Sequence, residues 1–160
     1  MDEVCVAVAD EQTDGRGRLE RVWQASAGRA LLASAGFRPL ELRAAHAWRL
    51  AAISSMAMLG AATSLLGPTA DRLALKWPND ILADGAKLGG ILIETVTAGG
   101  RHIAVIGIGL NVRLPCDIAE AVDVRASALE NVMPYAPSRH LLLAALLNAL
   151  AAMLDEFERA

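Results

Sequence analysis

The middle of the chain carries two strand-turn-strand patterns. It contains Ile81-Leu82-Ala83-Asp84-Gly85-Ala86-Lys87 and continues into an apolar run over residues 88–96. An Asp-Gly pair between two apolar segments favours a two-residue hairpin turn, because both turn positions need a positive φ. A second turn at Ala98-Gly99-Gly100 leads into another apolar segment, over residues 102–112. Consecutive hairpins of this kind predict an antiparallel or mixed sheet.

The flanking segments predict further strands and two helices. Short apolar stretches predict strands at residues 4–9, 30–35 and 73–77, and we expect the first of them to be buried. A long helix is predicted over residues 41–66, ending at Gly67-Pro68. An amphipathic helix is predicted from Ser138, its N-cap, to Phe157. The pattern predicts an α/β (α+β) fold in which helices flank a mixed, mostly antiparallel sheet.

Length and composition bound the class of protein. With 160 residues, 54% of them hydrophobic, the chain suits one compact domain and is too apolar for disorder. The net charge of −3 argues against a general nucleic-acid binder, which needs a basic excess. We predict no membrane-spanning segment and no leader, and therefore a cytoplasmic protein. Cys5 and Cys116 lie far apart, which predicts buried free thiols rather than a zinc site or a disulfide.

Several common catalytic signatures are missing from the sequence. The chain has no G-x-x-x-x-G-K-[ST] phosphate-binding loop. Its two G-x-G segments, which begin at Gly15 and Gly107, lack the third glycine of a dinucleotide fingerprint. His46, His102 and His140 stand alone, and no G-x-S-x-G elbow is present. A hydrolase interpretation therefore lacks a nucleophile with an oriented base.

The first polar cluster is rich in glycine and arginine. It reads Gln12-Thr13-Asp14-Gly15-Arg16-Gly17-Arg18-Leu19-Glu20-Arg21, with Trp23 just beyond it. Guanidinium groups on a glycine-rich loop can bind a phosphate or a carboxylate bidentately, and an indole can stack on a base. A solvated basic loop with Trp23 in the core would give the same pattern, so both interpretations stay open.

The two lysines of the chain begin two further polar clusters. Thirteen of the 15 basic residues are arginine, and the exceptions are Lys76 and Lys87. Lys76 opens Lys76-Trp77-Pro78-Asn79-Asp80, which also suits a plain turn. Lys87 opens Lys87-Leu88-Gly89-Gly90-Ile91-Leu92-Ile93-Glu94, and glycines recur in Gly107-Ile108-Gly109-Leu110-Asn111. Glycines inside neighbouring strands indicate that a ligand or another backbone comes close. Lys87 would present a point charge to a bound anion there, unless it is a surface lysine beside a kinked sheet.

Taken in order, these motifs resemble those of biotin protein ligases. The resemblance rests on the glycine-arginine loop and on the segments that begin at Lys76, Lys87 and Gly107. Ala126-Ser127-Ala128-Leu129 is also similar to a short segment that the family carries after its last motif. The resemblance covers residues 4–129 and implies the class II synthetase-like catalytic fold of biotin and lipoate ligases.

The resemblance implies a two-step ligase that forms a carbon–nitrogen bond. The carboxylate of biotin would attack the α-phosphate of Mg-ATP to give biotinyl-5′-AMP and pyrophosphate. A lysine of a biotin carboxyl carrier protein, such as an acetyl-CoA carboxylase subunit, would then attack this mixed anhydride. ATP and biotin would be the substrates, with Mg²⁺. A homodimer through the sheet edge is compatible with the family. With no helix-turn-helix before the motifs, the sequence does not support a DNA-binding repressor role. We expect neither nucleic acid nor membrane as a partner.

The same resemblance implies roles for individual residues. Lys87 and Arg18 would be catalytic. The biotin-binding positions would be Gln12, Arg16, Gly17, Arg18, Lys87 and Gly89. The nucleotide-binding positions would be Arg18, Arg21, Trp23, Lys76, Asp80, Lys87 and Asn111. Asp80 is also the position that would lie near the magnesium ion.

The chain departs from the family pattern at several points. Glu20 stands where the family's G-R-G-R-x-G-R-x-W has glycine, and its carboxylate is placed to pair with a neighbouring arginine. Gly28-Arg29-Ala30-Leu31 lacks the family's asparagine. The family's Ser/Thr-Asn biotin segment and its small C-terminal barrel have no counterpart here, so we expect one partial catalytic domain over residues 1–160. Two alternatives stand beside the biotin ligase: an impaired remnant that binds nucleotide or biotin weakly, and a lipoate ligase.

Overall fold

A computed structural model of the chain describes residues 4–37, 47–98, 101–114 and 125–159. Its single sheet has the strand order β1-β2-β6-β5-β4-β3, and every neighbouring pair of strands is antiparallel. The strands are β1 (Val4–Ala9), β2 (Ala30–Phe37), β3 (Leu73–Lys76), β4 (Asp80–Ala83), β5 (Ala86–Ala98) and β6 (Arg101–Asn111). The helices are α1 (Ala47–Leu66), α3 (Arg139–Arg159) and the short η1 (Arg18–Glu20), η3 (Gly67–Arg72) and η4 (Leu129–Asn131).

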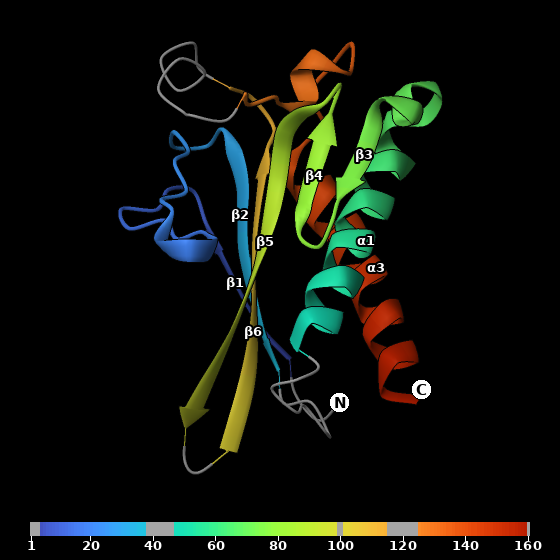
Figure 1. Cartoon of the computed structure of the whole chain (residues 1–160). Helices are drawn as coiled ribbons and strands as arrows, with labels where there is room; N and C mark the ends of the chain where they lie inside the picture. Colours follow the sequence, from blue (N-terminus) through green and yellow to red (C-terminus); the bar gives the residue numbers. More distant parts are fainter. Residues whose placement is uncertain (1–3, 38–46, 99–100, 115–124, 160) are drawn as a thin grey trace.

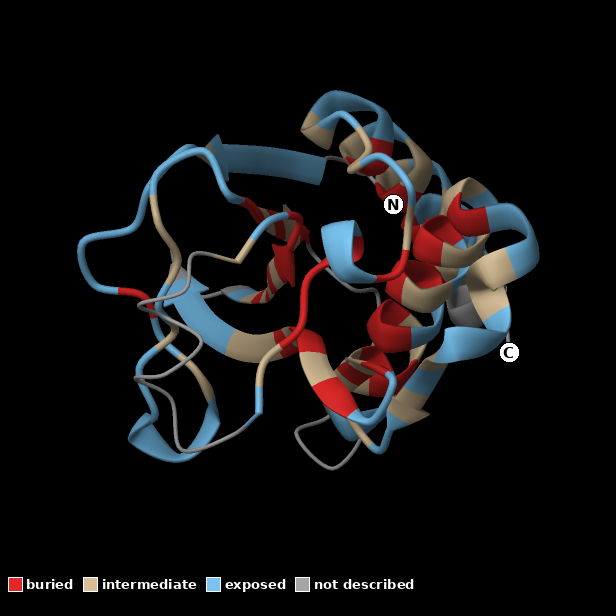
Figure 2. Ribbon diagram, turned by 90° about the horizontal axis from the view of Figure 1, so that it is seen from above, coloured by how far each residue is buried: buried red, intermediate tan, exposed pale blue. Residues whose placement is uncertain are grey.

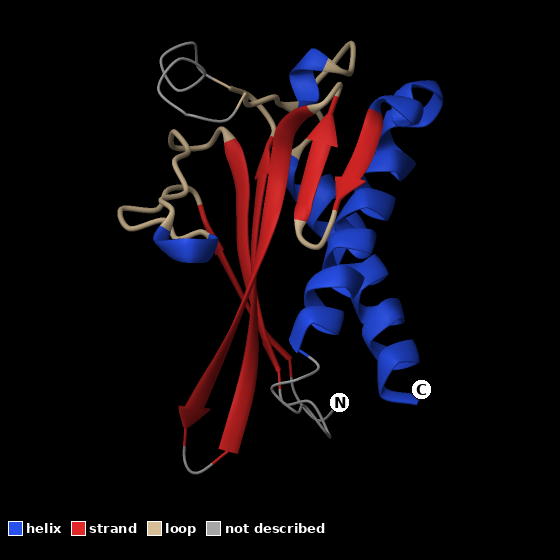
Figure 3. Ribbon diagram, viewed as in Figure 1, coloured by secondary structure: helices blue, strands red, loops and turns tan. Residues whose placement is uncertain are grey.

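The molecule has two layers. Helices α1 and α3 pack against each other and cover one face of the sheet, whereas the loop between β1 and β2 lies on the opposite face (Figures 1 and 3). Buried residues gather where the two helices meet the sheet (Figure 2). On α3 the buried residues recur every fourth position, at Leu142, Leu146, Leu150 and Leu154. This spacing places one apolar stripe of α3 in the core.

Strand β6 separates the core from the opposite face by simple alternation. Ile106, Ile108 and Leu110 are buried, and the intervening Gly107 and Gly109 face the other way. Because successive side chains of a strand point to opposite faces, the helices receive the large residues and the other face receives the glycines. On the face opposite the helices, β6 therefore carries no side chains at positions 107 and 109, which leaves space for other groups.

The structure confirms both predicted hairpins. Asp84 and Gly85 connect β4 to β5 with φ angles of +48° and +75°, as the Asp-Gly signal requires. Strands β5 and β6 pair as far as Ala98 and Arg101, and the turn at residues 99–100 lies outside the described residues. The helix predicted over residues 41–66 is described from Ala47 onward, and residues 41–46 lie outside the description.

The prediction of a buried first strand is wrong. Strand β1 is an edge strand, and Val4 and Val8 are 47% and 53% exposed. Cys5 is exposed with it, against the prediction of a buried thiol, and Cys116 lies outside the described residues. Apolar composition indicates a strand but does not say which neighbours cover it. β1 pairs with β2 alone, and its side chains are exposed on both faces from Val4 to Val8, so among the described residues no second layer covers it.

Helix α1 has the length and composition of a membrane span. The apolar segment Trp48–Arg72 meets the criteria for crossing a bilayer, and half of its most apolar window is buried inside the protein. Its contacts with α3 and with strands β3, β4 and β5 are those of a core helix. Burial against other elements of the chain accounts for its apolar character.

Candidate functional site

Two adjoining cavities lie next to the β1–β2 loop. The first, called the sheet cavity, has a volume of about 170 Å³ and is lined by residues of β2, β5, β6 and the loop. The second, called the hairpin cavity, has a volume of about 550 Å³ and lies between the loop and the β3–β4 turn. Both cavities are lined by Gly17, Arg18, Trp23, Asn79, Asp80 and Lys87. These shared residues mark where the two cavities meet.

A β-bulge turns Lys87 toward this junction. Ile81 pairs with Gly89 but the next residue, Leu82, pairs with Lys87, so Leu88 is an extra residue on β5. Without it, alternation would place Lys87 on the helix face of the sheet. With the bulge, Leu88 is fully buried and Lys87 lines both cavities. Bulges commonly re-aim a side chain beside a functional site in this way.

The backbone of Lys87 is held by a distant segment. Its N–H donates to the carbonyl of Arg125 over 2.8 Å, and its carbonyl accepts from the N–H of Ser127, also over 2.8 Å. This short parallel bridge uses the segment whose sequence resembles the family pattern after its last motif. The carbonyl of Ser127 accepts a 3.0 Å hydrogen bond from the side chain of Asn111. The start of β5 is therefore fixed on both sides.

The ammonium group of Lys87 is paired within the site. Its Nζ lies 2.9 Å from Oδ1 of Asp80. That same Oδ1 accepts a 3.3 Å hydrogen bond from the side-chain amide of Asn79. Asn79 is itself attached to β5 by two hydrogen bonds to Ile91. Its side-chain Nδ2 donates to the Ile91 carbonyl at 3.1 Å, and its backbone carbonyl accepts from the Ile91 N–H at 2.8 Å. The Lys76–Asp80 segment thus places one carboxylate and one amide beside Lys87.

The glycine-arginine loop is a small hairpin that closes over the site. Gly17 N–H donates to the Arg21 carbonyl at 2.7 Å, and Trp23 N–H donates to the Gly15 carbonyl at 2.8 Å. At its tip, Arg18 Nη1 donates to Oδ1 of Asn79 at 2.8 Å. The loop is thereby joined to the β3–β4 turn through a guanidinium group that lines both cavities.

The indole of Trp23 lies on Gly109. A Cβ atom at position 109 would stand only 2.6 Å from Cε2 of Trp23, so the ring occupies the space that a side chain would need. The Nζ of Lys87 lies 5.9 Å from the ring centroid, at the limit of a cation–π contact. Trp23 Nε1 is buried and has no hydrogen-bond partner among the described residues. The structure therefore places Trp23 at the junction, half-buried, rather than in the core.

The remaining predicted site residues fall on one cavity or the other, with one exception. Gln12 and Arg16 line the sheet cavity, whereas Arg21, Lys76 and Asn111 line the hairpin cavity. Gly89 lines neither, because it is buried against the Gly109 carbonyl and Leu110 of the neighbouring strand. Its neighbour Gly90 takes the cavity position.

Reasoning from the sequence assigned no site role to two residues that the structure places there. Glu94 lines the sheet cavity and forms an ion pair with Arg16, and Asn79 joins Arg18 to β5. Both residues belonged to quoted motifs, but their partners are distant in sequence. Glu20 was expected to pair with a neighbouring arginine. Among the described residues it forms no ion pair, and Arg16 pairs with Glu94 instead.

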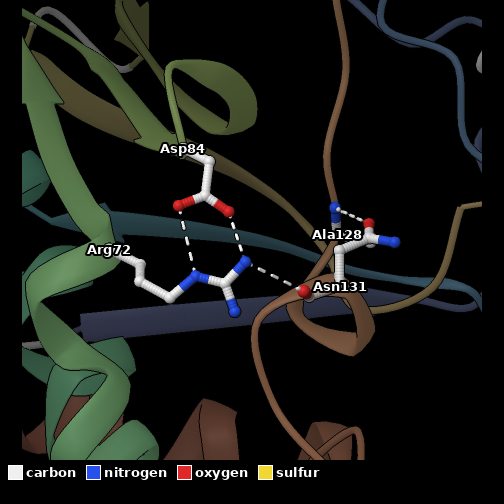
Figure 4. Close-up of polar contacts among 4 residues, drawn as sticks. All are labelled: Arg72, Asp84, Ala128 and Asn131. Atoms are coloured by element: carbon white, nitrogen blue, oxygen red, sulfur yellow. Dashed lines mark hydrogen bonds and ion pairs between the residues drawn. The ribbon is translucent and has the colours of Figure 1, made fainter.

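A second polar network supports the segment that holds Lys87. Arg72 donates through Nε and Nη2 to the carboxylate of Asp84, and Nη2 also donates to the carbonyl of Asn131 at 3.3 Å (Figure 4). The side chain of Asn131 accepts from the Ala128 N–H at 2.9 Å. The hydrogen bond from Arg72 lowers the pKa of Asp84, and the same contact raises the pKa of Arg72. The β4–β5 turn is thus tied to residues 128–131.

The cations gathered at the junction suit a protein that holds two anionic groups side by side. A model of the biotin/lipoate A/B protein ligase family matches residues 2–111. This match covers more than half of the chain, and the chain therefore belongs to the biotin/lipoate A/B protein ligase family.

Individual relatives agree with the family assignment. The chain is 35% identical over 156 residues to a Mycobacterium tuberculosis protein named biotin–[acetyl-CoA-carboxylase] ligase. The matched region covers 97% of this chain and 56% of the relative. The Aquifex aeolicus biotin protein ligase in complex with biotin and ATP has a TM-score of 0.76 and 28% identity, with 96% of this chain and 62% of that chain covered. The Leishmania major biotin protein ligase in complex with biotinyl-5-AMP has a TM-score of 0.79 and 25% identity, with coverages of 96% and 66%. The chain thus spans a little over half the length of the curated relative.

Proposed function

We propose that this chain carries the adenylation centre of a biotin protein ligase. In the first reaction, a carboxylate oxygen of biotin attacks the α-phosphorus of ATP, and pyrophosphate leaves. In the second, the ε-amine of a carrier-protein lysine attacks the acyl carbon of biotinyl-5′-AMP, which forms an amide and releases AMP. The observation that carries the proposal is the position of Lys87, which the bulge turns to the junction of two cavities.

The two cavities suit the two substrates. The sheet cavity is the smaller, and its floor is formed by glycines and small residues of β2 and β6, so biotin is assigned to it. The hairpin cavity is larger and carries Arg21 and Lys76, so the nucleotide is assigned to it. Attack of one anion on another needs cations that bring both together and stabilise the charge that develops at phosphorus. Lys87 and Arg18 line both cavities and supply that charge.

The other predicted residues take roles according to the cavity they line. Gln12, Arg16 and Gly17 are assigned to biotin, and Arg21, Lys76 and Asn111 to the nucleotide. Trp23 is assigned to adenine because it lines the hairpin cavity at the junction. Gly89 acts indirectly, since its missing side chain lets β5 approach β6 closely.

Magnesium is assigned to the Mg-ATP complex rather than to a site built by the protein alone. Within the part of the chain that the structure describes, no group of three or more metal-ligating side chains is present. Mg²⁺ is usually held by one or two carboxylates together with substrate phosphates, and Asp80 can supply one such carboxylate. When bound, the ion would neutralise phosphate charge, and Asp80 would be a residue that helps to hold it.

The loop has a second task after adenylation. A mixed anhydride hydrolyses in water, so the site must exclude solvent until the acceptor amine arrives. The Gly15–Trp23 hairpin is joined to the β3–β4 turn through Arg18 and to β6 through Trp23, which suits a cover over the bound intermediate.

The acceptor is proposed to be a biotin carboxyl carrier protein, and the protein is proposed to be soluble and cytoplasmic. Strands β1 and β3 are the two edges of the sheet, and the more exposed β1 edge is proposed as the surface for a homodimer. No nucleic acid or membrane is proposed as a partner.

Formation of the adenylate tests the proposal directly. The purified chain is incubated with biotin and α-labelled Mg-ATP, and labelled biotinyl-5′-AMP is separated from AMP; parallel reactions contain lipoate. Product with biotin, and its loss in Lys87→Ala, supports the proposal. If an adenylate forms with lipoate but not with biotin, the chain is a lipoate ligase instead. No product from a folded chain assigns the impaired remnant, and binding of biotin and ATP is then measured by calorimetry.

A further inference from the structure

One ion pair joins the glycine-arginine loop to the sheet across the sheet cavity. Arg16 Nη1 lies 3.0 Å from Oε1 of Glu94, and Arg16 Nη2 donates to Oε2 at 3.2 Å. This two-bond pairing connects residues that are 78 positions apart in sequence. The Nζ of Lys87 lies beside Gly90, 3.5 Å from the position that a Cβ would take there. Glu94 lies on β5 four residues after Gly90, which is about 13 Å along an extended strand. The pair therefore lies at the end of the cavity far from the reacting groups.

The loop's other side-chain contacts lie at the junction. Arg18 reaches Asn79, and Trp23 rests on Gly109, both at residues that line the junction or its floor. Among the described residues, Arg16–Glu94 is the ion pair that links the loop to the sheet. Without this pair, Arg18 and Trp23 would still hold the loop at the junction, but the part around Arg16 would no longer be held over the sheet cavity.

The carboxylate of the ligand assigned to the sheet cavity would lie beside Lys87, at the other end of the cavity. Both carboxylate oxygens of Glu94 instead face the Arg16 guanidinium. Paired with Arg16, the carboxylate is neutralised and serves to fix the position of the guanidinium. Arg16 can then face the ligand in one geometry instead of many.

We propose that Glu94 is a positioning residue, which holds the Gly15–Trp23 loop closed over the sheet cavity through Arg16. The proposal rests on the proposed function for the identity of the ligand, but the attachment of the loop does not depend on it. Its effect is exerted through the loop, and Glu94 itself leaves the reacting atoms untouched.

Trypsin reports on the attachment without any ligand, because the loop contains the cleavage sites Arg16, Arg18 and Arg21. Glu94→Gln keeps the size of the side chain and removes its charge. We expect the initial rate of cleavage in the loop, followed by mass spectrometry, to rise about two- to fivefold in Glu94→Gln, the range for an exposed ion pair. Glu156→Gln, a matched change on the exposed face of α3, should leave the rate unchanged. High salt should raise the rate for the wild-type chain toward that of Glu94→Gln, because screening weakens the same pair.

Activity provides the second measurement. The KM for biotin should rise by a similar factor in Glu94→Gln, with kcat changed less than about twofold, since uniform binding is lost rather than transition-state stabilisation. Equal cleavage rates in Glu94→Gln and wild type would overturn the proposal. So would a raised KM with an unchanged cleavage rate, which would mean direct contact with the ligand. If the chain does not use biotin at all, the proposed function fails while the cleavage rates still decide the role of Glu94.

Discussion

The Nζ atom of Lys87 lies 2.9 Å from Oδ1 of Asp80, and the two side chains are only 29% and 19% exposed. A lysine in this setting is held in one position by its carboxylate partner before any substrate arrives. Because the pair is largely removed from water, removing either member would leave the other charge partly buried without its partner, which destabilises the folded protein.

The Lys87–Asp80 pair should be detectable as coupling in protein stability. Among the described residues, Lys87→Ala leaves the Asp80 carboxylate with Asn79 as its side-chain donor, so the free energy of unfolding should fall by about 1–2 kcal/mol. Removing the carboxylate as well, in Lys87→Ala/Asp80→Asn, should restore at least half of that loss. Urea unfolding of the two single variants and the double variant measures the coupling. Strict additivity of the two changes would contradict it.

The Gly109–Trp23 contact predicts different tolerance at two glycines of one strand. Gly109→Ala would place a Cβ 2.6 Å from the indole, whereas Gly107→Ala would meet its nearest neighbour, the Leu92 carbonyl, at 3.4 Å. We expect Gly109→Ala to displace Trp23 and to cost about 1–3 kcal/mol, as overpacking does, and Gly107→Ala to cost less. Thermal unfolding measures the difference. Because the chain has two further tryptophans, acrylamide quenching is measured in a Trp48→Phe/Trp77→Phe background, where Trp23 alone reports the displacement. Equal stability of both variants would contradict this arrangement.

Glu20 occupies a position where the backbone favours glycine. Its φ angle is +60°, and that of the preceding Leu19 is +56°. A left-handed conformation costs a non-glycine residue about 1–2 kcal/mol, and the greater freedom of glycine in the unfolded chain offsets part of this. Glu20→Gly should therefore stabilise the protein by roughly 0.5–1 kcal/mol. Glu20→Ala is the control that removes the carboxylate but keeps the strained φ. A gain with alanine as large as that with glycine would assign the effect to charge.

The Arg72–Asp84 pair should contribute stability that depends on pH. The pKa of Asp84 is lowered in the folded state, chiefly by the hydrogen bond from Arg72. A group with a lowered folded pKa stabilises the protein above its unfolded pKa, near 4, and loses that contribution as the pH falls through the folded value. Wild type should therefore be more stable than Asp84→Asn at pH 7, and the difference should shrink below about pH 4. Urea unfolding at pH 7, 5 and 3 tests this, and a difference that grows with acidity would contradict it.

Much of the fold could be predicted from local signals. The Asp84-Gly85 turn, the apolar runs of β5 and β6 and the stripe of leucines on α3 depend on neighbours within a few positions, and the structure confirms them. Local signals did not reveal that β1 is exposed, because burial depends on which elements lie beside a strand. They also did not reveal the roles of Glu94 and Asn79, whose arginine partners are 78 and 61 positions away.

By itself, the sequence determined the order of the strands and helices and the motifs that identify the family, because turn chemistry, periodicity and residue type are properties of short segments. Only the tertiary structure decided where Lys87 points. Leu88 becomes an extra residue through the register between β4 and β5, and this register buries both Ile81 and Leu88 in the core, where α1 contacts the two strands. The bulge moves Lys87 from the helix face of the sheet to the junction of the two cavities.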